Sequence, residues 1–220
     1  MYERLFRTLG GERFRETVEM AVAEENRKAF VRRGVESMNG VRLDDVEQFC
    51  RSVELADGFP ELVNFCREHG IELVCAGEGL DVCVRKVLEQ NGAGDVRVVS
   101  NHLEELPDAA GRLAVVFPYD DAECTRCSCC TRNVMLTLCG DSDRIVFIGR
   151  TAHDACPAEY ADVIFARDML QRRCQERNIS YFLYTKLDEV AHRLGQIVKA
   201  KRLKVRREAA MKRRAAFIAE

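Results

Sequence analysis

The sequence predicts an α/β fold in which helices cover a parallel β-sheet, preceded by an all-helical N-terminal segment. Three observations support this prediction. Residues 1–56 carry apolar residues at helical spacing, short β-rich runs alternate with amphipathic stretches from residue 58 onward, and 47% of the chain is apolar while 32% is charged. Strands that alternate with helices are typical of a parallel sheet with helices on both of its faces.

Helical periodicity dominates the N-terminal segment. A charged amphipathic stretch at residues 13–33 places apolar side chains on one face, beginning with Phe14. A second stretch has apolar residues at the spacing i, i+3, i+4 and i+7, namely Val46, Phe49, Cys50 and Val53. This spacing predicts a helix with one buried face, in which Cys50 is a small core residue.

Helices and strands are expected to alternate through the middle of the chain. Pro60 suits the first turn of a helix and Gly70 its end. Further helices are expected at residues 80–90, 131–139 and 168–177, and strands at residues 71–75, 96–99, 113–117, 144–149, 163–165 and 181–184. The run at 144–149 is the clearest of these strands, because β-branched and aromatic residues dominate it.

The C-terminal part of the chain is strongly basic. A helix is expected to begin near Leu187 and to continue through residues 199–214, which contain nine Lys and Arg residues. Such a tail could contact phosphate, an acidic partner or a membrane surface, or it could be a solvated helix without a partner. We therefore divide the chain into a helical segment at 1–56, an α/β core at 57–194 and a basic C-terminal helix at 195–220.

Composition excludes several classes of protein. The formal net charge of the 220 residues is −2, which argues against a protein whose whole surface binds nucleic acid. No stretch approaches the ~20 apolar residues of a membrane span, and the N-terminus does not resemble a signal peptide. We therefore expect a cytoplasmic protein. Since a reducing cytoplasm disfavours disulfides, the eleven cysteines are expected to be core residues, metal ligands or reactive thiols.

Four cysteines form a cluster, the cysteine-rich knuckle at residues 124–130. Cys124, Cys127, Cys129 and Cys130 place four thiols within seven residues. A tetrahedral zinc site needs four ligands, and adjacent cysteines seldom both bind one ion. The knuckle would then supply three ligands, and the fourth would come from a residue elsewhere in the chain: Cys139, Cys156, His102 or His153.

Other roles of the knuckle stay open. An iron–sulfur cluster is an alternative, since thiolates suit it equally well, although the spacing matches neither common ferredoxin pattern. A redox role would require a lowered thiol pKa, for which Arg126 and Arg132 are the nearest cations in the sequence. The simplest alternative is a loop of small buried residues.

Five segments together resemble the haloacid dehalogenase superfamily, at residues 57–63, 76–81, 124–130, 148–154 and 165–170. The resemblance is closest to the 2-hydroxy-3-keto-5-methylthiopentenyl-1-phosphate phosphatases of methionine salvage, and more distant to phosphoserine phosphatase. It implies a Rossmann-like, three-layer α/β/α core, with residues 1–56 as a helical cap. It covers residues 15–195, and its most specific parts are the knuckle and the Phe-Ala-Arg-Asp at 165–168.

The sequence departs from active members of this superfamily at four places. No Asp-x-Asp motif, the source of the nucleophile, precedes the cap. Gly77, followed by Glu78, stands where a Ser or Thr would hold the phosphoryl oxygen. Thr131 stands at the position of a Lys, and Arg150 replaces the Asp of the Gly-Asp that holds Mg²⁺. Asp154 alone fits an acidic position of the family.

These departures lead to three hypotheses. The first is a phosphatase-like protein without activity, a pseudoenzyme that acts through binding, with the knuckle as a metal or redox element. The pocket that corresponds to the active site of the phosphatases would consist of six residues: Gly77, Glu78, Gly79, Arg150, Thr151 and Asp154. The alternative is a Mg²⁺-dependent phosphatase of small phosphomonoesters whose N-terminal motif is missing from this chain. The third is binding of an acidic partner or nucleic acid through the basic tail.

Two further expectations concern the pocket and the sheet. Glu78 would repel a phosphate unless it pairs with Arg150. In the family the first strand lies in the middle of the sheet, so its absence would leave a gap. A homo-oligomer or another protein partner could complete the sheet, since an open edge tends to pair with another chain.

Overall fold

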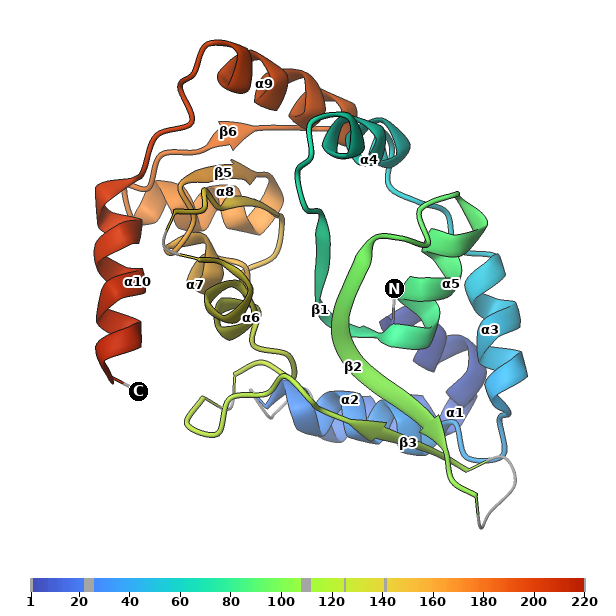
Figure 1. The fold of residues 1–220 in the computed structure, drawn as a ribbon. Coiled ribbons are helices and arrows are strands. Elements are labelled where there is room, and N and C mark those ends of the chain that lie inside the picture. Colours follow the sequence, from blue (N-terminus) through green and yellow to red (C-terminus); the bar gives the residue numbers. More distant parts are fainter. Residues whose placement is uncertain (1, 22–25, 108–111, 125, 141, 220) are drawn as a thin grey trace. The chain divides into compact units, whose positions relative to one another are not determined.

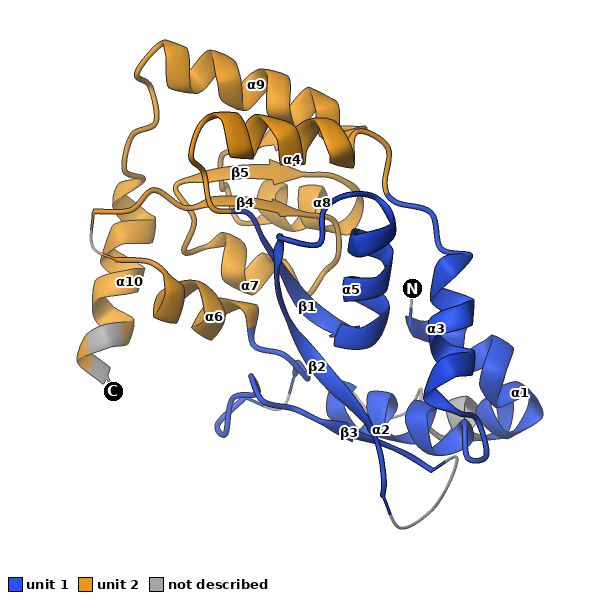
Figure 2. Cartoon of the chain, turned by 45° about the vertical axis from the view of Figure 1, so that its right-hand side comes forward, with its two compact units in different colours: residues 1–55, 73–130 blue, residues 56–72, 131–220 orange. Residues whose placement is uncertain are grey.

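The computed structural model describes residues 2–21, 26–107, 112–124, 126–140 and 142–219, and the chain forms two compact units. Figure 2 shows unit 1, residues 1–55 and 73–130, and unit 2, residues 56–72 and 131–220. Each unit draws on two separate parts of the sequence. The division at 1–56, 57–194 and 195–220 stays a prediction.

Unit 1 combines helices with a three-stranded sheet. Its elements are α1 (Tyr2–Ala21), α2 (Arg27–Ser37), α3 (Leu43–Arg51), β1 (Val74–Leu80), α5 (Asp81–Gln90), β2 (Arg97–Glu105) and β3 (Leu113–Val116). β1 and β2 are parallel, as expected, but β3 runs antiparallel to β2. The expectation of a parallel strand at 113–117 is therefore wrong. The connection from Glu105 to Leu113 is shorter than the dozen or more residues that a parallel crossover needs.

The core of unit 1 joins its helices to its sheet. It contains Leu5, Phe6, Phe14, Val31, Val35, Met38, Val46, Cys50, Leu80, Cys83 and Leu103. α1 and α2 pack closely because Gly34 leaves room for the Phe6 ring, which would lie 2.3 Å from a Cβ at that position. Phe14 is buried, as its helical spacing predicts. Residues 22–25 of the predicted amphipathic stretch at 13–33 lie outside the described residues.

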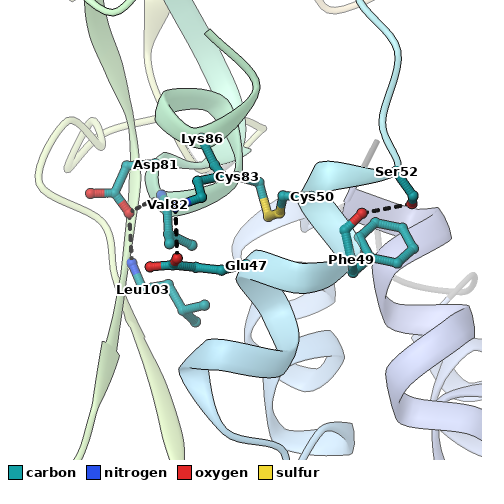
Figure 3. The surroundings of a disulfide bond; sticks show 9 residues. All are labelled: Glu47, Phe49, Cys50, Ser52, Asp81, Val82, Cys83, Lys86 and Leu103. Carbon is teal, nitrogen blue, oxygen red and sulfur yellow. Dashed lines mark hydrogen bonds and ion pairs between the residues drawn. A yellow bond between two sulfur atoms is a disulfide. The ribbon is translucent and has the colours of Figure 1, made fainter. Parts of the chain in front are cut away.

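A disulfide in unit 1 was not predicted. Cys50 of α3 and Cys83 of α5 are bonded, with their Cα atoms 5.3 Å apart (Figure 3). Lys86 and Glu47 form an ion pair of 3.0 Å between the same two helices. Both cysteines are buried, which confirms Cys50 as a core residue. The expectation of unpaired cysteines is wrong for these two, because it came from the expected compartment and not from any local pattern.

Unit 2 contains a parallel sheet with helices around it (Figure 1). Its elements are α4 (Phe59–Glu68), α6 (Thr131–Leu138), β4 (Val146–Gly149), α7 (Ala155–Ala158), β5 (Val163–Ala166), α8 (Asp168–Glu176), β6 (Phe182–Leu183), α9 (Leu187–Lys199) and α10 (Arg207–Ala219). The strand order is β4-β5-β6, and the short strand at 181–184 is thereby confirmed.

The basic tail is two helices, not one. α9 ends at Lys199, and Lys201 has a positive φ of 51°, which a continuous helix does not allow. Asp162 holds the second helix in place: its carboxylate accepts the backbone N–H of Arg206 at 2.9 Å and the guanidinium of Arg213 at 3.1 Å. A third donor, the backbone N–H of Ile145, lies 3.0 Å from the same carboxylate. Much of the predicted solvated tail is therefore tied to unit 2.

The α/β class is confirmed by both units, each of which has parallel strands beside helices. β1 is an end strand of its sheet, and β4 is an end strand of the other. Within the described residues, no helix is both long enough and apolar enough to span a bilayer.

Candidate functional site

The residues of the predicted pocket belong to two different units. Gly77 and Glu78 lie in unit 1, near the carboxyl end of β1, while Arg150 and Asp154 follow β4 in unit 2. Each unit therefore holds its own group of these residues.

Glu78 is the centre of a polar network in unit 1. Its carboxylate accepts the backbone N–H of Ser128 at 2.9 Å and pairs with Nε of Arg27 at 3.2 Å. The Glu78 side chain is only 14% exposed, so these contacts replace water. Within unit 1, the ion-pair partner of Glu78 is thus Arg27, at the start of α2. Glu78 ties the knuckle to β1 and to α2.

Asn101 joins the same network and was not predicted. It is fully buried in β2, where its Nδ2 donates to the carbonyl of Glu78 at 2.8 Å and to Oγ of Ser128 at 2.9 Å. Its Oδ1 is buried and has no hydrogen-bond partner among the described residues. Asn is depleted in strands, so an Asn two residues after the β-rich run at 96–99 was the available clue.

Two of the four cysteines of the knuckle are packing residues, while Cys124 and Cys127 are half-buried. Cys129 and Cys130 are buried, and the Cys129 thiol faces the carbonyl of Val99 at 3.8 Å. Burial raises the pKa of Cys129 to about 12, so its sulfur is a protonated thiol at neutral pH. The redox hypothesis requires a shift in the opposite direction and gains no support at this residue.

No group of three or more His, Cys, Asp or Glu residues that could hold a metal ion occurs in the part of the chain that the structure describes. The zinc and iron–sulfur hypotheses for Cys124, Cys127, Cys129 and Cys130 thus gain no support. Of the four outside ligands considered, His102 instead bonds to Asp81 at 2.8 Å. The other three belong to unit 2, whereas the knuckle belongs to unit 1: Cys139, Cys156 and His153.

Asp154 is held at the carboxyl end of β4 in unit 2. Its Oδ2 accepts the backbone N–H of Arg150 at 2.8 Å and that of Thr151 at 2.7 Å. The preceding Gly149 permits this tight turn, since a Cβ there would lie 2.8 Å from the Leu170 side chain and 2.9 Å from Cβ of Asp154. The sequence thus fixes one carboxylate at the point where a parallel strand ends, the usual place for ligands in α/β folds.

Arg150 pairs with Asp168 beside this carboxylate. Its Nη2 lies 3.0 Å from Oδ2 of Asp168, and both side chains are more than half exposed. Asp168 has a positive φ of 51°, which is rare for a residue other than glycine and is often seen at functional sites. A second cation, Arg167, stacks on the Tyr184 ring at 5.2 Å. Two guanidinium groups therefore lie close to the end of β5.

The Mg²⁺ ion that the resemblance implies does not fit these residues. Magnesium requires near-octahedral oxygen ligands, usually from more than one protein group. Asp154 offers one carboxylate. Arg150 stands at the position where a second carboxylate would be needed, and its fixed positive charge repels a cation. Asp168 is already paired with Arg150. We therefore derive no step that involves the metal.

Comparisons with known proteins agree with this geometry. A family model described as Putative Phosphatase matches residues 2–181. The chain is 27% identical over 161 residues to a 2-hydroxy-3-keto-5-methylthiopentenyl-1-phosphate phosphatase from Bacillus cereus strain B4264, covering 72% of each protein. It is 25% identical over 162 residues to the protein of the same name from Brevibacillus brevis, covering 72% of this chain and 71% of that one.

Solved structures show the same fold. The probable phosphoserine phosphatase from Vibrio cholerae is similar with a TM-score of 0.70 and 19% identity, covering 91% of this chain and 62% of that chain. Phosphoserine phosphatase from T. onnurineus is similar with a TM-score of 0.59 and 14% identity, covering 88% of this chain and 86% of that one.

Proposed function

This chain belongs to the Putative Phosphatase family, within the haloacid dehalogenase superfamily, and we propose that it acts on small phosphomonoesters as a phosphatase. The match over residues 2–181 carries this proposal, because it includes the predicted pocket residues of both units. Curated relatives named as phosphatases of a phosphorylated small molecule support the same class of substrate.

The residues of unit 2 suit part of this chemistry. Phosphoryl transfer depends on positioning and on neutralising the phosphoryl oxygens. Arg150 is exposed and could leave Asp168 to donate two N–H groups to a phosphate. Asp154 holds the backbone of that loop in place through two hydrogen bonds, so it positions Arg150.

The nucleophile of this phosphatase must come from outside the described residues. A carboxylate is needed to form an aspartyl-phosphate. We assign this carboxylate to a strand that a further segment or a partner supplies. The end strands β1 and β4 support this part of the proposal, since each can accept one more neighbour.

The test is phosphate release by protein purified from its own cells, so that any supplied strand is present. Asp154→Asn removes the anionic acceptor of the Arg150 loop and should lower turnover by about tenfold or more. Asp44→Asn is the matched control, since this side chain is 84% exposed on α3, and its turnover should not change. Equal activity of both variants would refute the role of Asp154.

A second candidate function is phosphomonoester binding without hydrolysis, as expected for a pseudoenzyme. The Arg150–Asp168 ion pair favours it, because it stands where an active relative would bind metal. Binding of phosphoserine without phosphate release, weakened by Arg150→Ala, would support this candidate over the first.

A further inference from the structure

A large open pocket lies in unit 2, away from the motif residues. Its volume is about 940 Å³, and its walls come from the start of β5, the segment before β6, the linker at 202–206 and the first turns of α10. β5 and β6 are parallel, so this pocket lies at the amino ends of the strands. Arg150 and Asp168 follow the carboxyl ends of β4 and β5, at the opposite edge.

The pocket combines an apolar wall with a charged rim. The apolar side chains are Val163, Ile164, Ile179, Tyr181, Phe182 and Val205. The charged ones are Arg177, Arg202, Lys204, Arg206 and Lys212, against Glu159, Asp162 and Glu208. Cations therefore exceed acids by two. A mostly apolar pocket with a few fixed polar groups is the usual form of a small-molecule site.

The acids of the rim are largely engaged by the cations around them. Glu159 pairs with Arg177 and with Lys212. Asp162 is fully buried and accepts donors from the linker and from α10. Because these acids are already neutralised, they do little to oppose an incoming anion.

The three cations of the linker, Arg202, Lys204 and Arg206, outnumber Glu208, the remaining acid of the rim. The side chains of Arg202 and Lys204 are exposed and form no ion pair in the described part of the chain. Arg206 donates to the carbonyl of Ala158 at 3.0 Å, which fixes its guanidinium, and its buried Nε has no partner among the described residues. Burial lowers the pKa of Arg206, although Glu208 and Asp162 act in the opposite direction.

We propose that this pocket binds a small amphipathic anion. Its aromatic or branched apolar part would lie against Ile179, Tyr181 and Phe182, and its anionic group would contact Arg202 and Lys204. The volume suits such a molecule, since ligand pockets usually measure about 300–1,000 Å³. The site does not depend on the proposed phosphatase activity, because it shares none of the residues of that site.

The experiment uses 1-anilinonaphthalene-8-sulfonate, an aromatic sulfonate, in a fluorescence titration of the full chain. The double variant Arg202→Glu/Lys204→Glu should raise Kd by about tenfold or more, because two attractive charges become repulsive. Raising NaCl from 0.05 to 0.5 M should weaken binding to the wild type. The matched control is Arg172→Glu/Lys199→Glu, two exposed cations of unit 2 outside the pocket, and its Kd should stay within about twofold.

Two results would overturn the proposal. One is an unchanged Kd in the pocket variant, and the other is an equal loss in the control variant, which would indicate general charge attraction. Urea unfolding of both variants shows whether they are folded. Arg150→Ala separates the two sites: it should weaken phosphoserine binding without changing the sulfonate titration.

Discussion

Replacing Glu78 by Ala should loosen the knuckle, because Glu78 is its main polar anchor. The variant leaves the buried N–H of Ser128 without its carboxylate acceptor, which costs about 1.5–3 kcal/mol. It also removes the pair with Arg27, whose side chain is 28% exposed, and such a pair adds up to about 1 kcal/mol. We therefore expect the free energy of unfolding to fall by about 2–4 kcal/mol.

Urea unfolding and cysteine alkylation together measure this effect. Cys129 is 2% exposed in the folded protein, so iodoacetamide should label it much faster in Glu78→Ala than in wild type. Glu104→Ala removes an exposed carboxylate from the β2–β3 hairpin and serves as the control, with a change within about 0.5 kcal/mol. If Glu78→Ala matched this control in both measurements, Glu78 would not anchor the knuckle.

Three further predictions concern buried or paired groups. Asp162→Ala should lower the free energy of unfolding, measured in urea, by about 3–5 kcal/mol, because it removes a fully buried carboxylate that accepts hydrogen bonds from three donors. A loss below about 1 kcal/mol would contradict this prediction. Burial opposes ionisation of Glu159, but Lys212 and Arg177 outweigh it and lower its pKa. The free energy of unfolding of the wild type should therefore exceed that of Glu159→Gln by its full amount above about pH 4.5, and this difference should shrink as the pH falls through the lowered pKa. A constant difference from pH 7 to 2 would refute this prediction. Cys129, with a pKa of about 12, should resist iodoacetamide at pH 8 in the native wild type, and rapid labelling there would show an accessible thiolate.

Local periodicity predicted most elements of unit 2. The apolar runs at 144–149 and 163–165 became β4 and β5, and the Asp168 helix became α8. These elements are short and strongly patterned, so their own residues determine them. The family resemblance, which rested on segments of both units, is confirmed.

Long-range pairing could not be predicted in the same way. The direction of β3 depends on a hairpin connection, and a β-rich run has no direction in its sequence pattern. Cys50 and Cys83 are 33 residues apart, and nothing local marks them as partners. Likewise, Asn101 acquires its role only because the fold brings Glu78 and Ser128 to it.

The break in the basic tail shows a third limit. The charge pattern at 199–214 fits a continuous helix, but Asp162 recruits both the backbone of Arg206 and the side chain of Arg213. This tertiary contact outweighs the helical propensity of the linker, which is worth only a few tenths of a kcal/mol per residue.

Phosphate release from a panel of small phosphomonoesters tests the central claim most directly. The natural protein, assayed with Mg²⁺ and again with EDTA, should release phosphate at about 1 s⁻¹ or faster from at least one substrate in at least one of the two conditions. The absence of release from every substrate under both conditions would contradict phosphatase activity and leave phosphomonoester binding as the function of this site.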